Sequence, residues 1–487
     1  MADLSKLEPR AVWEQFEAVT KVPRPSKKEG KMIAFLENFA KVHGLEYKKD
    51  AVGNIVILKP ASAGMEGRPA VVLQSHMDMV CEKNSGVRNA GGGVFDFERD
   101  PICTRIDGDW VRAEGTTLGA DDGIGIAAAL ALLIDGKVKH GPLEALFTVD
   151  EETGLTGAFN LGGDMISGKY LINLDSEDEG EVFIGCAGGV DTLAWFDYTT
   201  EKAPAGYRFF AVSVSGLKGG HSGDDIEKGL GNSNKILARL LWSGLADFGL
   251  RLSEIDGGNL RNAIPREARA LVAVPEGKAD GFMKFFEGFA ADILAELQYT
   301  DAGVRVEMNK ADAADVIDEK TARNLVYALA GVPNGVQAMS FAMPGLVETS
   351  TNLASVKMAD GKIVVTTSQR SSVESAKAWA AAAVESVFAL AGARVEHSDG
   401  YPGWSPNPHS HILDVTEKAY MKLFGAKAKV RAIHAGLECG LFLEKYPQLE
   451  MVSIGPTLRG VHSPDERLEI STVGKFWKLL IEILEKI

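Results

Sequence analysis

Histidine and acidic residues of this sequence stand where apolar runs end. The run 69–75 is followed by His76 and Asp78, the run 143–149 by Asp150, Glu151 and Glu152, and the run 169–174 by Asp175. Short apolar runs of this kind are typical of buried strands. In open α/β sheets, ligands bind just beyond the carboxyl ends of the strands. The sequence therefore predicts a site built from side chains at strand ends.

His76 and Asp78 are separated by one residue. In an extended chain their side chains point to the same side. This spacing would let His76 bind a metal ion while Asp78 orients the imidazole ring. The alternative is a core histidine that ends a strand, with a solvated aspartate beside it, and this stretch taken alone favours that alternative.

Asp121 and Asp122 lie in a glycine-flanked turn that runs into a helix predicted over 124–135. An aspartate at a helix N-terminus is commonly only a cap. One of the pair can be that cap, which leaves the other carboxylate to point into a cleft. His462 lies in another loop, after the strand predicted at 451–455.

Three consecutive acids, Asp150, Glu151 and Glu152, follow a predicted buried strand. A run of charge on a loop is usually solvated. Directly after a buried strand, carboxylates at close range repel one another unless a cation neutralises them. If one of Glu151 and Glu152 binds that cation, the other remains free to take a proton from water and pass it to a leaving amine.

Two imidazoles and several carboxylates suit a divalent transition metal, zinc first, with cobalt or manganese also possible. A carboxylate such as Asp121 can bridge two ions, and water held by two ions ionises near neutral pH. The chemistry predicted is metal-assisted hydrolysis of an amide. The alternative explains each group separately, as core filler, helix cap or solvated loop charge, and requires all of them to fall at strand ends by accident.

Composition limits the class of protein. The chain has 487 residues, for which two domains are the prior expectation. Its net charge of −15 argues against nucleic acid or an anionic membrane as the main partner. The four cysteines form no C-x-x-C pair, and the N-terminus has no signal-peptide character. A reducing cytoplasm is the expected compartment.

Strands alternate with helices over the first part of the chain, which predicts an α/β domain with a mostly parallel sheet. The segment 82–117 is expected to be a surface loop. From 189 to 403 there are about two strands per helix, which indicates an inserted α+β module with an antiparallel sheet. The α/β pattern then resumes. The expected organisation is a catalytic domain formed by 1–188 and 404–487, interrupted by a module over 189–403.

The ordered set of His-x-Asp, Gly-Ala-Asp-Asp-Gly, Glu-Glu, a strand-end Asp and a late His resembles the co-catalytic di-zinc exopeptidase family, which includes aminoacylase and peptidase T. Longer stretches, such as VLQSHMDMV, GTTLGADDGIG, IHAGLECGLF and MVSIGPTLRGVHSPDE, resemble the aminoacyl-histidine (Xaa-His, carnosinase-like) dipeptidases of that family. The resemblance covers essentially the whole chain. It implies that one zinc ion is held by His76 and Asp175, the other by Glu152 and His462, and both by Asp121. It further implies Glu151 as general base and Asp78 as the residue that orients His76.

The same resemblance implies a homodimer whose inserted module is a lid and dimerisation domain. His221 resembles a lid histidine that polarises the scissile carbonyl, and Asn262 and Arg370 resemble groups that hold the substrate. An arginine fork suits the substrate's carboxylate. Glu438 is expected to contact the substrate's amine or to support the metal ligands, and His434 has no expected role. From the residues alone, a turn histidine and a surface arginine would be the simpler explanations of His221 and Arg370.

The leading hypothesis is a zinc dipeptidase that cleaves Xaa-His dipeptides, such as β-Ala-His, behind a closed lid that excludes water. One alternative is a different exopeptidase or an N-deacylase with the same metal site, because specificity depends on pocket contacts. A second alternative is a metal-binding protein that has lost catalysis, against which the presence of Glu151 beside Glu152 argues.

Overall fold

The computed structural model describes residues 2–487, and the chain divides into two compact units. Unit 1 consists of the residues up to Gly185 together with Pro406–Ala432 and Glu438–Ile487. Unit 2 consists of Cys186–Ser405 and the short segment Ile433–Leu437, which sequence analysis assigned to the catalytic domain. Among the described residues, no helix combines the length and the apolar character needed to cross a bilayer.

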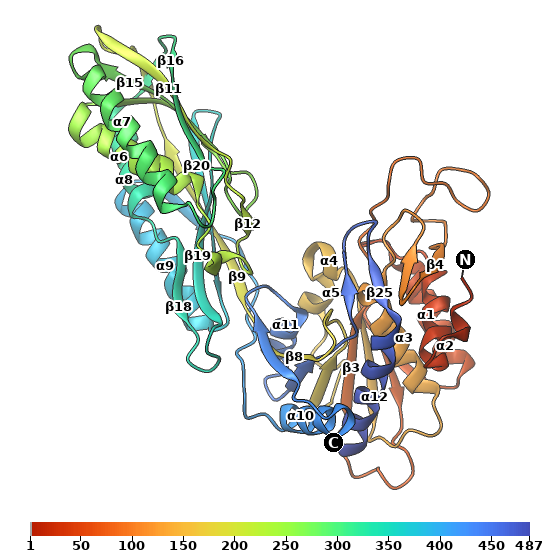
Figure 1. Cartoon of the computed structure of the whole chain (residues 1–487). Helices are drawn as coiled ribbons and strands as arrows, with labels where there is room; N and C mark the ends of the chain where they lie inside the picture. The colour runs from red at the N-terminus through yellow and green to blue at the C-terminus, as the bar shows by residue number, and fades with distance from the viewer. Residues whose placement is uncertain (1) are drawn as a thin grey trace. The chain divides into compact units, whose positions relative to one another are not determined.

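Unit 1 is built on an eight-stranded sheet (Figure 1). Its strands, in spatial order, are β1 (Glu46–Lys49), β2 (Ile55–Lys59), β6 (Leu143–Thr148), β3 (Val71–His76), β7 (Tyr170–Asn173), β23 (Glu450–Ser453), β8 (Glu181–Cys186) and β22 (Lys429–Ile433).

The central strands of this sheet are parallel, and they are the ones that precede the candidate site residues. β6, β3, β7 and β23 run in the same direction, whereas β1, β2 and β8 pair antiparallel to their neighbours. Every residue of β3, β6 and β7 is buried, as expected for strands covered on both faces. The sheet expected to be mostly parallel is thus a mixed sheet, with parallel strands at its centre and antiparallel strands beside them.

The helices of unit 1 are α1 (Arg10–Thr20), α2 (Gly30–Val42), α3 (Ala120–Ile134), α4 (Glu151–Gly154), α5 (Thr156–Asn160), α10 (His411–Phe424), α11 (Glu438–Lys445) and α12 (Ile470–Lys486). Of these, α3 is apolar and almost entirely buried.

Unit 1 also holds a four-stranded sheet of β24 (Leu458–Arg459), β25 (Arg467–Glu469), β5 (Trp110–Ala113) and β4 (Thr104–Asp107). The prediction of a loop over 82–117 is wrong where β4 and β5 form. Three of the four residues of β4 are exposed, so this strand lacks the apolar run by which buried strands are recognised.

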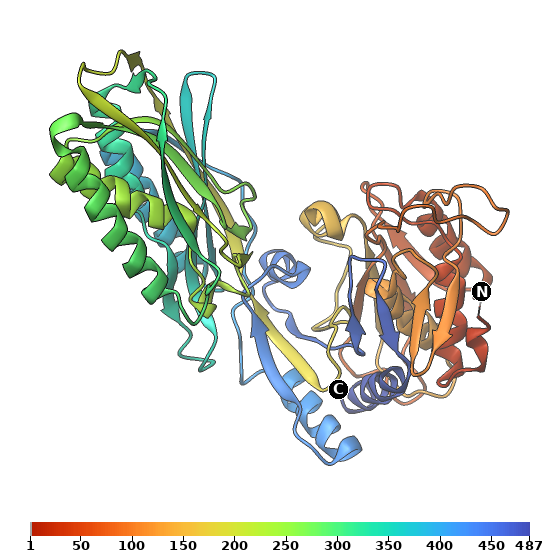
Figure 2. The same ribbon diagram turned by 45° about the horizontal axis from the view of Figure 1, so that its top comes forward.

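Unit 2 contains an antiparallel sheet of β16 (Arg305–Ala311), β11 (Tyr207–Ser215), β15 (Ala268–Pro275), β13 (Arg251–Gly257), β19 (Val347–Ala359), β20 (Lys362–Ser371), β9 (Gly188–Asp197) and β21 (Arg394–His397), with β18 (Gly335–Met339) beside β19. The helices α6 (Ser233–Phe248), α7 (Glu276–Glu296), α8 (Glu319–Gly331) and α9 (Glu374–Leu390) cover one face of the sheet (Figure 2). Their apolar sides and that face form one hydrophobic core.

Candidate metal centre

The first group of candidate ligands lies at the end of β3. His76 is the last residue of this strand and is 1% exposed. Its Nε2 lies 3.0 Å from Asp121 Oδ1 and 3.5 Å from Asp175 Oδ1. Asp121 comes from the non-helical start of α3, and Asp175 follows the end of β7 by two residues. Three segments that are far apart in sequence thus meet at one point, as the strand-end argument predicted.

The second group shares Asp121 with the first. His462 Nε2 lies 3.2 Å from Asp121 Oδ2 and 3.1 Å from Glu152 Oε2. Asp121 thus faces one histidine with each of its carboxylate oxygens. In each group, one donor atom from every residue lies within 4.8 Å of the others. This is the arrangement that a carboxylate bridging two ions requires.

Two features show that these side chains suit a metal ion: the types of their donor atoms, and a buried carboxylate oxygen that has no hydrogen-bond partner in the described chain. Glu152 Oε1 is buried and has no hydrogen-bond partner in the described chain. Burial, followed by the charges of Asp122 and Asp121, raises the pKa of Asp175 well above its usual range. Crowded buried carboxylates of this kind are stabilised by a divalent cation, and imidazole and carboxylate together suit zinc and its neighbours. The residues therefore suit a metal centre.

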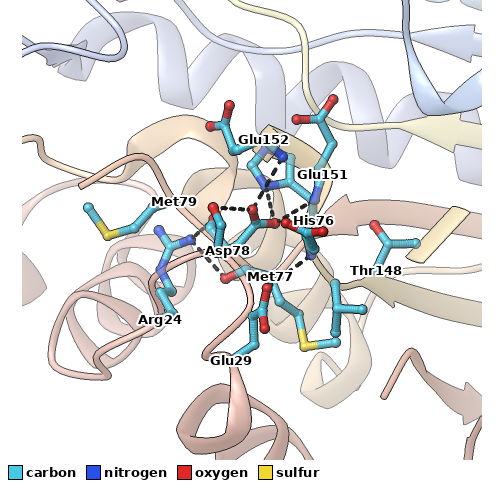
Figure 3. A network of polar contacts seen from close by, with 12 residues as sticks. Arg24, Glu29, His76, Met77, Asp78, Met79, Thr148, Glu151 and Glu152 are labelled. Carbon is cyan, nitrogen blue, oxygen red and sulfur yellow. Dashed lines mark hydrogen bonds and ion pairs between the residues drawn. The ribbon is translucent and has the colours of Figure 1, made fainter. Parts of the chain in front are cut away.

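Asp78 connects His76 to the turn that carries the two glutamates (Figure 3). Its Oδ1 lies 3.4 Å from His76 Nδ1 and accepts the N–H of Glu151 at 3.0 Å, while Oδ2 accepts the N–H of Glu152 at 3.3 Å and the Ser26 hydroxyl at 2.7 Å. Burial opposes the charge of Asp78, but the close contact with His76 and the hydrogen bonds from Ser26 and the Glu151 N–H outweigh it and lower the pKa to about 2. Asp78 is held as an anion in the orienting position.

The three consecutive acids have different surroundings. The Asp150 carboxylate accepts the hydroxyls of Thr153 and Thr156 in its own turn. Glu151 and Glu152 each offer a donor atom close to His76. Burial, followed by the charges of Glu438 and Glu152, raises the pKa of Glu151 well above its usual range.

The sequence did not decide whether Asp121 or Asp122 caps the following helix, and in the structure Asp122 is the cap. Its Oδ1 accepts the N–H of Gly125 at 3.1 Å, and the residue is buried. Burial raises the pKa of Asp122 to about 8. The peptide bond between Asp121 and Asp122 is cis, a feature that residue types and spacing did not indicate.

Glu438, at the start of α11, is buried beneath the strand ends. Its Oε2 accepts Gln74 Nε2 at 2.6 Å and the Thr148 hydroxyl at 2.9 Å, and Oε1 is buried without a hydrogen-bond partner in the described chain. Burial raises the pKa of Glu438 to about 7. Gln74 and Thr148 belong to β3 and β6, so these contacts join two strands that lead to the candidate site.

Of the residues expected to contact substrate, His221, Asn262 and Arg370 lie in unit 2, whereas Glu438 lies in unit 1. His221 belongs to β12 (Gly220–His221), which pairs with β14 (Ala263–Ile264), and the carbonyl of Asn262 accepts the N–H of Ser222 at 2.8 Å. Asn262 is itself exposed in the turn before β14, whereas Arg370 is 6% exposed near the end of β20.

Arg370 is a buried cation without an anionic partner. Its Nη1 donates to the Tyr401 hydroxyl at 2.8 Å, its Nε is buried without a hydrogen-bond partner, and no carboxylate of the described chain lies within ion-pair distance. His434 lies nearby, with Nε2 2.7 Å from the hydroxyl of Ser350, the register partner of Arg370. Burial, and then the charge of Arg370, lowers the pKa of His434 to about 3.

Tyr401 was missed as a site residue in the sequence, and His434 was left without a role. The sequence around Tyr401 indicates only a domain boundary, and no sequence motif links this tyrosine to Arg370. Both residues are recognised by their position beside the buried guanidinium of Arg370, which has no anionic partner in the described chain. This arrangement exists only after folding.

Comparisons with known proteins identify the family to which this chain belongs. A model of peptidase family M20/M25/M40 matches residues 72–486. Cytosol non-specific dipeptidase of Escherichia coli (strain K12) is 44% identical over 489 residues, which cover 100% of this chain and 99% of that protein.

Among solved structures, aminoacylhistidine dipeptidase from Vibrio alginolyticus superposes with a TM-score of 0.94 at 42% identity, over 100% of this chain and 98% of that one. Aminopeptidase PepT from Bacillus cereus ATCC 10987 gives a TM-score of 0.56 at 16% identity, over 99% of both chains, which shows a shared fold. The strand-end site, the family match and these likenesses lead to one conclusion: the chain belongs to peptidase family M20/M25/M40 and is a metallopeptidase.

Proposed function

We propose that this protein is a dipeptidase that hydrolyses Xaa-His dipeptides such as β-Ala-His and depends on two divalent metal ions, zinc first. The observation that carries the proposal is the pair of histidine–carboxylate groups that share Asp121, with Glu151 close to His76. The likeness to the aminoacylhistidine dipeptidase of Vibrio alginolyticus supports the substrate class. The name of the Escherichia coli relative supports a cytosolic location.

In this proposal His76 and Asp175 hold one ion, Glu152 and His462 hold the other, and Asp121 holds both. When bound, such ions would polarise the scissile carbonyl. They would also lower the pKa of the attacking water, so that it loses its proton near neutral pH and becomes a stronger nucleophile. Asp78 keeps the His76 ring in orientation through Nδ1, because an imidazole that binds a metal through one nitrogen is fixed by the hydrogen bond at the other.

Glu151 is the proposed general base. It takes a proton from the attacking water and delivers it to the leaving amine, which requires a carboxylate that can hold a proton for part of the cycle. Burial and the neighbouring carboxylates raise the pKa of Glu151 well above its usual range, which supports this role.

The substrate's free carboxylate is proposed to bind Arg370. A guanidinium that is buried and unpaired is stabilised by an anion, and Tyr401 fixes its orientation. His221 and Asn262 are proposed as the further substrate contacts, with His221 polarising the scissile carbonyl. Glu438 is proposed to support the site through Gln74 and Thr148, or to contact the substrate's amine through its free oxygen. The proposal includes a homodimer.

A second candidate is a dipeptidase of broad specificity. The name of the Escherichia coli relative, which includes the word non-specific, favours it. The metal centre would be the same in both cases, because the side-chain pocket alone sets the preference.

The test is hydrolysis of a small panel by metal-stripped protein to which zinc is returned. The panel contains β-Ala-His, Gly-His, Ala-Leu and an N-acetyl amino acid, and the variants are Glu151→Gln and, as control, Glu46→Gln on the exposed side of β1. The proposal expects zinc-dependent cleavage of the histidine dipeptides, lost in the first variant and kept in the second. Equal cleavage of Ala-Leu would establish the broad dipeptidase, cleavage of the acetylated compound a deacylase, and metal binding without turnover a non-catalytic protein.

A further inference from the structure

Glu466 makes an unusual set of hydrogen bonds. It follows His462 by four residues, is 2% exposed, and directs its carboxylate at the backbone of 118–121, the segment named here the Asp121 loop. Oε2 accepts the N–H groups of Leu118 at 2.7 Å and Gly119 at 3.0 Å, and Oε1 accepts those of Ala120 at 2.7 Å and Asp121 at 3.4 Å. Every residue of the loop therefore donates to this one carboxylate. Charge-assisted bonds of this kind are about twice as strong as neutral ones.

Arg24 binds the same loop through a backbone carbonyl. It is 1% exposed, and its guanidinium donates to the carbonyls of Met77 at 3.0 Å, Asp78 at 2.5 Å and Gly119 (Figure 3 shows Arg24 beside Met77 and Asp78). The residue Gly119 is therefore held at its N–H by Glu466 and at its carbonyl by Arg24. Gly119 has φ 68°, and a Cβ there would lie 2.7 Å from Arg24 Nη2, so this close approach requires glycine.

These two side chains connect the loops that carry the candidate ligands. Arg24 joins the segment of His76 and Asp78 to the Asp121 loop, and Glu466 joins the Asp121 loop to the loop of His462. Neither charge forms an ion pair within 4.0 Å in the described chain. Glu466 is directed at backbone N–H groups of the Asp121 loop, and Arg24 at backbone carbonyls of that loop and of the segment after β3.

The arrangement answers a physical problem at the site. Asp121 must face both histidines with its two oxygens, but the neighbouring carboxylates repel it until cations arrive. A loop fixed only by its own ligand contacts would have to be ordered at the moment of binding, which reduces affinity. A loop that is already fixed avoids this loss.

We propose that Glu466 and Arg24 are positioning residues that hold the Asp121 loop in its metal-binding conformation before any ion is bound. The inference rests on the metal centre of the proposed function. According to this inference, Glu466 and Arg24 raise the affinity for the metal ions. This effect is additional to the contribution that any buried, hydrogen-bonded charge makes to the stability of the fold.

The matched control for Glu466 is Glu144 on β6. Glu144 is also buried, and its carboxylate accepts the N–H groups of Ser167 at 2.8 Å and Gly168 at 3.1 Å and the Ser167 hydroxyl. It lies near the start of β6, whereas Asp150–Glu152 follow the end of that strand. Replacing either glutamate by glutamine places an amide NH₂ against backbone donors, so both variants test the loss of a buried acceptor.

The experiment compares Glu466→Gln and Glu144→Gln with the unaltered protein. Metal-free samples are titrated with Zn²⁺ against a chelator, and Co²⁺-loaded samples are read by their visible spectrum. Both variants are expected to melt earlier when metal-free. Glu466→Gln alone is expected to lose about 10- to 100-fold in affinity, the usual effect of altering an outer-shell partner, and to change the Co²⁺ spectrum. Unchanged affinity and spectrum in Glu466→Gln, or an equal loss in Glu144→Gln, would overturn the inference.

Two further measurements keep the test decisive if Glu466→Gln does not fold. Arg24→Lys keeps the charge but removes the fork, and it is expected to weaken Zn²⁺ binding in the same direction. In the unaltered metal-free protein, the amides of 118–121 are expected to be protected from hydrogen exchange; exchange at the rate of an open loop, with protection only after Zn²⁺ is added, would overturn the inference. Failure of the unaltered protein to bind Zn²⁺ or Co²⁺ would instead reject the metal centre itself.

Discussion

Neighbouring acidic residues in this chain carry different tasks because the backbone turns them to different partners. Asp121 faces two histidines, while Asp122 caps the helix that follows. Asp150 stays within its own turn, while Glu151 and Glu152 each place a donor atom near His76. Substitution of Asp121, Glu151 or Glu152 should therefore affect the candidate metal centre directly, whereas substitution of Asp122 or Asp150 should affect the local backbone.

Arg370 offers a prediction about the substrate's carboxylate. Replacing it with lysine removes the fork and one charge-assisted hydrogen bond, which is worth about 2 kcal/mol, or roughly 30-fold. We expect KM for a dipeptide to rise by that factor, and KM for the same dipeptide with a C-terminal amide to change little. Steady-state kinetics on the two substrates measure the difference. Arg239→Lys, at an exposed ion pair on α6, is the control, and an equal effect on both substrates would contradict the role.

His434 offers a prediction about pH. Its pKa is lowered to about 3 in the folded chain by burial and by Arg370, whereas an unfolded histidine titrates near 6.5. The unfolded state therefore binds the additional proton between these values, and the stability of the folded state falls as pH drops below about 6.5. The loss is about 1.4 kcal/mol per pH unit.

The measurement for His434 is urea unfolding of metal-free protein at pH 7 and pH 5, compared with His434→Gln. The variant should lose about 2 kcal/mol less stability than the unaltered protein over this range. The exposed His43→Gln serves as control. A difference of the same size in the control, or none in His434→Gln, would show that His434 does not titrate in this way.

The sequence predicted the residues that the structure gathers around Asp121, because their chemistry is visible in their type and their place after apolar runs. It could not predict Arg24, Tyr401 or Glu466 as positioning groups. Their partners are backbone carbonyls, backbone N–H groups and one guanidinium, which only the folded chain brings to them. For the residues expected to bind substrate, the resemblance to a family was needed, since a turn histidine or a strand arginine carries no signal alone.

At the scale of elements, the parallel strands β6, β3 and β7 explain why the candidate site is where it is. Parallel neighbours end at the same edge of a sheet, so the residues after each strand meet there. The apolar runs made these strands predictable. The antiparallel pairing of β1, β2 and β8 was not predictable. Strand order depends on how the chain crosses from one strand to the next, and the local sequence pattern contains no information about these connections.

Gly455, just after β23, supplies a prediction about strand ends. A Cβ at Gly455 would lie 1.7 Å from the carbonyl oxygen of Ser176, the residue after Asp175. Gly455→Ala must therefore push Gly455 and the segment after β7 apart, at a cost of about 1–3 kcal/mol, and we expect this to move Asp175 relative to His76. We expect a lower melting temperature and weaker Zn²⁺ binding.

The control for Gly455 is Gly163→Ala, because a Cβ there meets nothing within 4 Å. Thermal melts and zinc titrations of both variants are the measurement. If Gly455→Ala melted early but bound Zn²⁺ as tightly as the unaltered protein, the position of the segment after β7 would not determine the geometry of the metal centre.

At the scale of the whole molecule, the chain forms two units with separate interiors. The sequence indicated this division through the change from alternating strands and helices to about two strands per helix. It could not show that Ile433–Leu437 belongs to the second unit, because five residues carry no composition signal. The candidate metal ligands all come from unit 1, whereas the unpaired Arg370 lies in unit 2.

This division predicts how the protein responds to loss of metal. An ion that binds only the folded form stabilises it by about 2.7 kcal/mol at a concentration 100 times its Kd. Since His76, Asp121, Glu152, Asp175 and His462 all belong to unit 1, removal of the ions should destabilise that unit and leave the antiparallel core of unit 2 unchanged. Differential scanning calorimetry with zinc and with a chelator should show two transitions, of which one moves to lower temperature. Movement of both by the same amount would mean that the two units unfold together, and movement of neither would mean that zinc does not bind the folded protein in preference to the unfolded chain.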